Sequence, residues 1–233
     1  GVPAGGFQSH KAPPDAPALY QRRADGTIWL YNGKPCDGAS CPGWQMLDKN
    51  QQTVSIVAPG FPDPVNLILY KRHNNGEIWR YTQTPCKGAW CPGWEGLDKN
   101  PKIQEIIPAG THLYQRHNDG AIWHYKGTPC KGDLCPGWEQ LDDNPKTVEI
   151  TAAAVGNNDV PMLYKRHDDG EIWRYTGPSC SGASCWQLID NNKAISIVTS
   201  SHCLYQLRDN GSIWVYVSPP RCGGAGPGWQ PLD

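Results

Sequence analysis

Apolar and polar positions alternate in the same order five times along this chain. Most copies start with a β-branched apolar segment, such as TVSIVA at residues 53–58, followed by Leu-Tyr and a polar pair. An Asn/Asp-Gly turn, the segment Ile-Trp-x-Tyr, a cysteine loop and a second Trp segment ending in Asp complete the copy. Alternation with a period of two is typical of strands, and no segment has a helical period. The pattern therefore predicts four short strands per copy.

The Asn/Asp-Gly pairs predict a tight hairpin between the second and third strand of every copy. The second copy reads Asn74-Asn75-Gly76 between LYKRH and EIWRY. Both central residues of such a turn can take positive φ, which suits a two-residue hairpin loop. Because side chains alternate along the third strand, we expect Ile78 on one face of the sheet and Trp79 on the other.

Four antiparallel strands in a unit of 41 to 50 residues match a propeller blade. The fold class predicted is all-β, a five-bladed β-propeller with four antiparallel strands per blade and disulfide-stapled loops. A solenoid is the alternative, but solenoid ends need polar caps and the last copy shows none, which favours a closed ring. The domain covers residues 1–233, with approximate repeats at 1–50, 51–100, 101–144, 145–192 and 193–233.

The segment Val2-Pro3-Ala4-Gly5 resembles Ile107-Pro108-Ala109-Gly110 of the third copy. It is therefore predicted to supply the first strand of the first blade. Leu232-Asp233 would then complete the fifth blade beside it and close the ring.

Composition narrows the class of partner. The formal net charge of −1 creates no field that favours nucleic acid or an anionic membrane. The chain has 11 Trp and 10 Tyr but only 2 Phe and 2 Met, so most of its large aromatic and sulfur-containing side chains carry a hydroxyl or an indole N–H. That composition suits a core and also suits a sugar-binding surface. No apolar run approaches the roughly 20 residues that a membrane-spanning helix needs.

The ten cysteines predict five disulfides. Four pairs share the spacing Cys-x4-Cys, whereas zinc sites usually have Cys-x2-Cys spacing and a second pair nearby. The two remaining cysteines fall at facing ends of one hairpin. Disulfides imply an oxidising, extracellular route, and the start Gly-Val-Pro is consistent with a processed product, so we expect a secreted protein. The expected pairs are Cys36–Cys41, Cys86–Cys91, Cys130–Cys135, Cys180–Cys185 and Cys203–Cys222.

Hairpin topology predicts that repeated polar groups gather at one end of the ring, where the turns and the links between blades meet. An aromatic face beside Arg, His, Asp and Asn is the chemistry that a sugar requires, because its C–H face packs on the ring and its hydroxyls need donors and acceptors. The predicted carbohydrate-binding residues are Arg22, Arg72, Arg116, Arg166, His73, His117, His167, Trp29, Trp79, Trp123, Trp173, Trp214, Asp48, Asp98, Asp142, Asp190, Asn50, Asn100, Asn144 and Asn192.

Structural roles for the same residues remain open on sequence alone. The Trp of Ile-Trp could serve only to pack blades together, the Asp residues could hold the turn into the next blade, and the Arg residues could pair with those Asp residues between blades. The second Trp of each copy is expected to be structural. Those residues are Trp44, Trp94, Trp138, Trp186 and Trp229.

The copies differ in their polar residues. Leu207 and Arg208 replace Arg and His in the fifth copy, and Arg23 replaces His in the first. If the Arg-His pair forms the site, the second, third and fourth copies are complete.

Enzyme signatures are missing from the sequence. It has no GxSxG, no HExxH and no phosphate-cradling glycine loop, and near-identical copies argue against one asymmetric catalytic pocket. His73, His117 and His167 fall one per blade, so we expect no metal site and no cofactor. No Asp-rich calcium loop occurs either.

The repeats resemble those of the β-propeller lectins, the tachylectin-like and tectonin-like proteins of invertebrates and fungi. The resemblance covers nearly the whole chain, and five units match the tachylectin-like ring better than the six-bladed tectonins. It implies a recognition or defence lectin with one sugar site per blade or blade interface, for N-acetylhexosamines or methylated sugars. The Cys-x4-Cys loops depart from the tachylectin pattern.

The function predicted is therefore that of a secreted, multivalent, non-catalytic lectin. Its partners would be glycans or glycoconjugates, and it would form a monomeric ring or a weak oligomer. The alternative is an extracellular propeller that binds a protein as an adaptor or inhibitor. A protein partner favours variation between copies, whereas the mostly repeated polar set favours a small, repeated ligand.

Overall fold

A computed structural model describes residues 18–59, 68–153, 161–177, 185–200, 203–217 and 228–233 of the chain. These residues form antiparallel sheets, as the alternation predicts. Within them, no helix has the length and apolar character needed to cross a bilayer.

The strands form five separate sheets, each in sequence order. The first sheet contains β1 (Tyr20–Arg22), β2 (Ile28–Tyr31) and β3 (Trp44–Asp48). The second contains β4 (Thr53–Val57), β5 (Tyr70–His73), β6 (Ile78–Tyr81) and β7 (Trp94–Asp98). The third contains β8 (Ile103–Ala109), β9 (His112–His117), β10 (Ile122–Tyr125) and β11 (Trp138–Asp142). The fourth contains β12 (Thr147–Ala153), β13 (Met162–His167), β14 (Ile172–Tyr175) and β15 (Trp186–Asp190). The fifth contains β16 (Ala194–Ser200), β17 (Cys203–Arg208), β18 (Ile213–Val217) and β19 (Gly228–Pro231).

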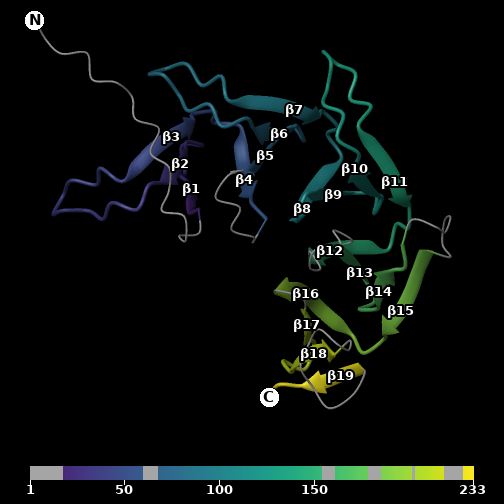
Figure 1. Cartoon of the computed structure of the whole chain (residues 1–233). Helices are drawn as coiled ribbons and strands as arrows, with labels where there is room; N and C mark the ends of the chain where they lie inside the picture. The colour runs from purple at the N-terminus through teal and green to yellow at the C-terminus, as the bar shows by residue number, and fades with distance from the viewer. Residues whose placement is uncertain (1–17, 60–67, 154–160, 178–184, 201–202, 218–227) are drawn as a thin grey trace, which may run out of the picture.

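The sheets are arranged around a common centre with their first strands innermost (Figure 1). β12 lies against both β8 and β16, and β4 approaches β8. The five sheets follow an arc, and the first and fifth sheets lie at its two ends (Figure 1). The described residues thus show five blade-like sheets but not the closed ring expected from the sequence. The predicted strand at Val2–Gly5 lies outside the described residues.

The predicted hairpins are confirmed, but their turn type was wrong. Gly76 is the residue with positive φ (+87°), and neither Asn before it shares that conformation. The Gly76 amide donates to the His73 carbonyl (3.1 Å), and the His73 amide donates to the Glu77 carbonyl (2.9 Å). This is a three-residue loop with a bulged glycine, which needs only one left-handed residue.

The core lies between sheets and not within them. Between the second and third sheets, Tyr70, Ile78 and Leu97 pack against Ile106 and Leu113. Equivalent residues fill the other three spaces between neighbouring sheets. Each sheet therefore contributes one apolar face to the sheet before it and another to the sheet after it.

The disulfides Cys36–Cys41, Cys86–Cys91 and Cys130–Cys135 are confirmed, each in the loop between the last two strands of its sheet. Cys185 and Cys203 are also disulfide-bonded, but Cys180 and Cys222 lie outside the described residues. The Cys86 amide donates to the Met46 carbonyl (3.1 Å) and the Cys130 amide to that of Gly96 (2.9 Å). Each of these two loops is thus anchored on the outer strand of the preceding sheet.

Candidate functional site at the hairpin end of the sheets

The predicted site residues do meet at one end of the sheets, which we call the hairpin rim. It comprises the Asn/Asp-Gly hairpin turns, the end of the last strand of each sheet and the links that follow those strands. A Cβ on Gly76 would lie 2.1 Å from the Asn100 carbonyl oxygen, so the hairpin turn lies directly against the link to the next sheet. The same contact recurs between Gly120 and Asn144.

The Asn residues of the rim shape these links. The side-chain oxygen of Asn100 accepts a hydrogen bond from the Lys102 amide (3.0 Å), and its main-chain oxygen accepts one from Ile103 (3.2 Å). Asn50 and Asn144 make the same pair of bonds. Asn192 differs, because its side-chain amide donates to the Asp190 carboxylate (2.5 Å). A carboxamide oxygen used in this way fixes a turn.

The Asp residues of the rim join neighbouring sheets. Lys71 Nζ lies 2.5 Å from Asp48 of the preceding sheet, and both side chains are almost fully buried. The Lys71 ammonium also lies 4.3 Å from the ring centre of Trp94. Lys165 and Asp142 repeat the arrangement at 2.6 Å.

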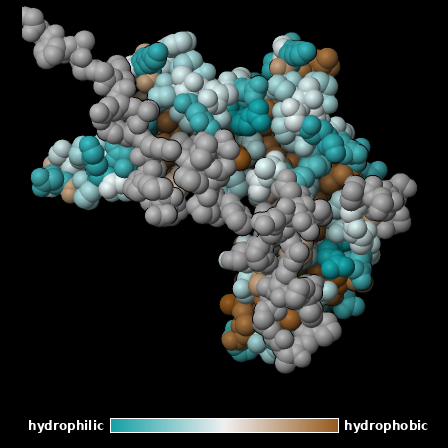
Figure 2. All heavy atoms as spheres, viewed as in Figure 1, coloured by the Kyte–Doolittle hydropathy of each residue, from teal (hydrophilic) through white to brown (hydrophobic). Residues whose placement is uncertain are grey.

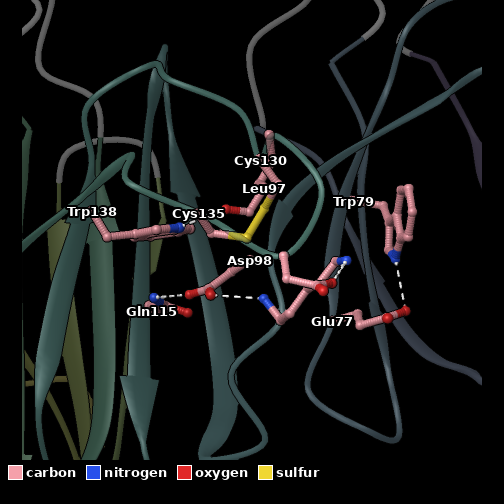
Figure 3. Close-up of a disulfide and its surroundings, with 10 residues drawn as sticks. Glu77, Trp79, Leu97, Asp98, Gln115, Cys130, Cys135 and Trp138 are labelled. Carbon is pink, nitrogen blue, oxygen red and sulfur yellow. Dashed lines mark hydrogen bonds and ion pairs between the residues drawn. A yellow bond between two sulfur atoms is a disulfide. The ribbon is translucent and has the colours of Figure 1, made fainter.

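A neutral side chain replaces the lysine in the third sheet. Gln115 donates to Asp98 at 2.7 Å, and Figure 3 shows its amide facing that carboxylate. The sequence pattern alone does not reveal these lysine and glutamine partners.

Two of the four predicted Arg residues, Arg116 and Arg166, pair with glutamates and not with the Asp residues considered as partners above. Arg116 Nε lies 2.9 Å from Glu105, and Arg166 Nε lies 2.7 Å from Glu149. Each glutamate also accepts a main-chain N–H from the next sheet at 3.2 Å. Arg22 donates to the Thr53 carbonyl of the second sheet instead (3.3 Å). Only the fifth sheet shows the expected kind of pair among the described residues, between Arg208 and Asp190 (3.6 Å).

Each of the three rim histidines is buried beneath the Trp of the Ile-Trp segment in the same copy. We call the five Trp residues at this position the rim tryptophans (Trp29, Trp79, Trp123, Trp173 and Trp214). His73, His117 and His167 are at most 3% exposed. Their ring centres lie 5.6 to 6.0 Å from those of Trp79, Trp123 and Trp173. Burial lowers the pKa of all three imidazoles, so the neutral form is favoured. These side chains support the indoles from below.

Acidification is therefore expected to destabilise the fold through these histidines. A histidine whose folded pKa is depressed binds its proton first in the unfolded chain, so stability is lost as pH falls below about 6.5. Burial lowers the pKa of His124 as well, to about 4, which extends the window to that pH. We expect Tm to fall between pH 7 and pH 4.5.

A matched variant isolates the histidine contribution. His117→Phe keeps a ring against Trp123 and removes one titrating group, so the variant's Tm should depend less steeply on pH. An unchanged pH dependence of Tm in His117→Phe would contradict this assignment.

The rim tryptophans are partly exposed in all five sheets, and internal bonds fix most of them. Trp79 donates its indole N–H to Glu77 (3.2 Å), as Figure 3 shows, and Trp173 donates to Glu171 (3.1 Å). A side-chain hydroxyl accepts the indole N–H of Trp29 and another accepts that of Trp214, at 2.9 Å each. In the third sheet Ala121 stands at this position, and the N–H of Trp123 has no partner. The indoles are thus the members of the predicted set with solvent-accessible aromatic surface at every copy.

Four of the five second tryptophans are structural, as expected. Trp94 and Trp138 donate their indole N–H to the carbonyls of Leu47 and Leu97 in the preceding sheet, at 2.9 and 2.8 Å. Trp229 does the same to Ile189 (2.9 Å). Trp186 is buried in the core between the third and fourth sheets.

One group at the rim has the composition of a metal site. His167, Asp169 and Glu171 place potential ligand atoms within 4.8 Å of one another. However, Asp169 is ion-paired with Lys146 (3.0 Å), and Glu171 accepts the indole N–H of Trp173. Both carboxylates therefore already have partners within the protein. The expectation that the protein binds no metal remains a prediction.

No protein-family model matches this sequence, and no curated protein matches it. Solved structures do match the fold. The structure of human WBSCR16 is 9% identical, with a TM-score of 0.56 over 88% of this chain and 62% of that one. Prp20p from Saccharomyces cerevisiae, described with its binding to Gsp1p and histones, is 10% identical with a TM-score of 0.52 over 82% and 54%.

A third match comes from the structure of Kap60 bound to yeast RCC1 (Prp20). It is 10% identical, with a TM-score of 0.53 over 88% of this chain and 57% of that one. This chain therefore spans less than two thirds of the proteins it resembles in structure. At these identities the likeness shows the fold alone, and that fold is a β-propeller.

Proposed function

We propose that this chain is a secreted, multivalent lectin of the tachylectin-like or tectonin-like kind, a five-bladed propeller that binds glycans without catalysis. The observation that supports the proposal is the set of five partly exposed indoles, which occupy equivalent positions on the hairpin rim. A sugar ring packs its C–H face on an indole, and such packing tolerates a solvent-exposed site. Three disulfides within the chain are compatible with secretion.

The polar part of each site would come from groups beside the indole. Glu77 and Glu171 are only half-buried, and each uses a single oxygen atom for its tryptophan. Arg23 and Arg208 place guanidinium groups 4.3 and 4.0 Å from the ring centres of Trp29 and Trp214. Carboxylates and guanidinium groups can pair with hydroxyl or N-acetyl groups of a sugar. The Arg, Asp and Asn residues that engage other parts of the chain would hold the indoles in place.

Binding to a clustered glycan surface tests the proposal. The double variant Trp79→Ala/Trp173→Ala removes two of the five indoles, so binding to a dense glycan array should fall by at least about tenfold through lost avidity. Trp90→Ala is the matched control, because Trp90 is 63% exposed but lies in a disulfide loop outside the rim. The variants' circular dichroism should match that of the wild type.

Equal loss of signal in Trp90→Ala and the double variant would argue against the rim as the site. Quenching of wild-type tryptophan fluorescence by the best glycan gives an independent reading that needs no variant.

A protein partner is the second candidate. The rim is not identical in every sheet, because Arg23, Leu207 and Arg208 replace the residues found in the middle three copies. Among the similar structures, yeast Prp20 is described with Gsp1p, histones and Kap60 as binding partners. A glycan array without signal from folded protein would favour this candidate.

A further inference from the structure

The chain contains a single Asn-x-Ser/Thr motif, Asn210-Gly211-Ser212, in the turn between β17 and β18. This motif is the acceptor for N-linked glycosylation in secreted proteins. The equivalent turns of the other copies lack either the Asn or the hydroxyl residue, as in Asp25-Gly26-Thr27 and Asn75-Gly76-Glu77. Those turns have the same glycine with positive φ, so the fold does not require the motif.

The Asn of the motif is accessible. Asn210 is exposed in its turn, and the residues at the same position in the middle three sheets, Asn75, Asp119 and Asp169, are exposed as well. Each of those three sheets has a neighbouring sheet on both sides. Exposure at this position is therefore a property of the turn and does not depend on the fifth sheet lying at the end of the arc.

The folded turn can carry a glycan without losing a hydrogen bond. The Ser212 hydroxyl donates to Asn210 Oδ1 (2.7 Å), and the Ser212 amide donates to the same oxygen (3.0 Å). Neither bond uses Nδ2, the atom to which an N-linked glycan is attached. Because the linkage keeps the carboxamide oxygen, both bonds would persist after modification.

The turn also borders apolar surface. Ile213, which follows Ser212, is 42% exposed, and Figure 2 shows hydrophobic residues gathered on the side of the fifth sheet that faces the open side of the arc. N-linked glycans are bulky and raise the solubility of the surface beside them. A glycan in this turn would therefore lie where the described residues expose apolar side chains.

We propose that Asn210 carries an N-linked glycan, which covers the hairpin rim of the fifth sheet. The donor is an oligosaccharide linked to a lipid diphosphate. A C–N bond forms between the anomeric carbon of the first sugar and Asn210 Nδ2. The C–O bond to the diphosphate breaks, the lipid diphosphate leaves with the bonding electron pair, and Nδ2 loses one proton. This inference rests on the secretion that is part of the proposed function.

The glycan would lie beside the rim tryptophan of the fifth copy. The Ser212 hydroxyl accepts the indole N–H of Trp214 (2.9 Å), so one hydroxyl contacts both Asn210 and Trp214. The Arg208 guanidinium lies 4.0 Å from the centre of the Trp214 ring and covers part of the indole. With a glycan next to it, this indole would not be open to an external sugar. The binding sites would then come from the other four copies.

Mass spectrometry of the secreted chain tests the modification. Protein produced behind a signal peptide and recovered from the medium of eukaryotic cells should lose the mass of one glycan on treatment with peptide N-glycosidase. Asn210→Asp should show no such loss. Wild-type protein recovered from the medium without a glycan would overturn the proposal.

The other copies of the turn supply the control variants. Asn210→Asp should fold normally, because Asp25 accepts the same two bonds from the Thr27 amide (3.0 Å) and hydroxyl (2.7 Å). Glu77→Thr completes the motif at the exposed Asn75 and should add a second glycan. A glycan at Asn75 in this variant, with none at Asn210, would show that the cells modify such turns but not this one, and would overturn the proposal.

Hydroxyl-radical footprinting tests whether the glycan covers the rim. Trp214 should be oxidised less in the glycosylated protein than in Asn210→Asp, whereas oxidation of Trp79 should be equal in the two proteins. Equal oxidation of Trp214 would overturn the covering of the fifth rim. None of these measurements uses an external sugar, so a glycan array without signal would leave the modification standing. An unmodified Asn210 would likewise leave the lectin proposal standing.

Discussion

Replacing Asp48 by Ala should lower the free energy of unfolding by about 3–5 kcal/mol. Lys71 would remain buried without its carboxylate, since the two side chains are 4% and 7% exposed. Two indoles, Trp94 at 4.3 Å and Trp79 at 5.8 Å, flank the ammonium and leave little room for water to replace the carboxylate. Urea denaturation followed by circular dichroism measures the change.

The third sheet provides the control for this prediction. Asp98→Ala removes a carboxylate whose partner is the neutral Gln115, so its cost should be smaller, about 1–3 kcal/mol. Asp142→Ala, which leaves Lys165 unpaired, should resemble Asp48→Ala. If all three variants lost the same free energy, buried charge would not be the cause.

Gly93→Ala should be among the most damaging single substitutions, with a loss of more than about 4 kcal/mol. A Cβ at this position would lie 1.9 Å from the Thr84 carbonyl oxygen. The backbone cannot move away without breaking the hydrogen bond from the Thr82 amide to the Gly93 carbonyl (2.8 Å). Gly43 and Gly137 show the same close approach in the first and third sheets.

Gly88 is the control for backbone strain without a clash. Its φ is +61°, but a Cβ there would have no neighbour within 4 Å. Gly88→Ala should therefore cost only about 1–2 kcal/mol, the usual penalty for a left-handed residue. Similar denaturation midpoints for the two variants would contradict the role assigned to the close approach at Gly93.

Most of the fold follows from local pattern in the sequence. The hairpins, the third strands and the Cys-x4-Cys disulfides depend on residues close together in the chain, and all three were predicted. The turn type was not, because an Asn-Gly pair is compatible with two hairpin loops of different length. The arc was not predicted either, because the number of sheets does not fix the angle between them.

The sequence predicts where the candidate site residues lie, but it predicts the role of only some of them. Chain topology brings Asp48, Asn100 and Trp79 to the hairpin rim. It does not reveal that Asp48 forms an ion pair with Lys71 or that Arg166 forms one with Glu149. Lys71 lies at a strand position that reads as solvent-facing in an alternating pattern, and only the packing of one sheet on the next buries it. Glu149 lies beside Arg166 on the neighbouring strand of the same sheet, so that pair depends on strand register.

Sequence comparison between copies could have identified one of these pairs. The residue after Leu-Tyr is Lys or Gln in all five copies, a restriction that a solvent-facing strand position does not require. In four sheets this residue is buried.

Calorimetric titration with a monovalent form of the best array glycan tests the central claim of a repeated-site lectin most directly. We expect three to five equivalent sites per chain, and a lower stoichiometry in Trp79→Ala/Trp173→Ala than in the wild type. One site per chain, unaffected by that double variant, would contradict it.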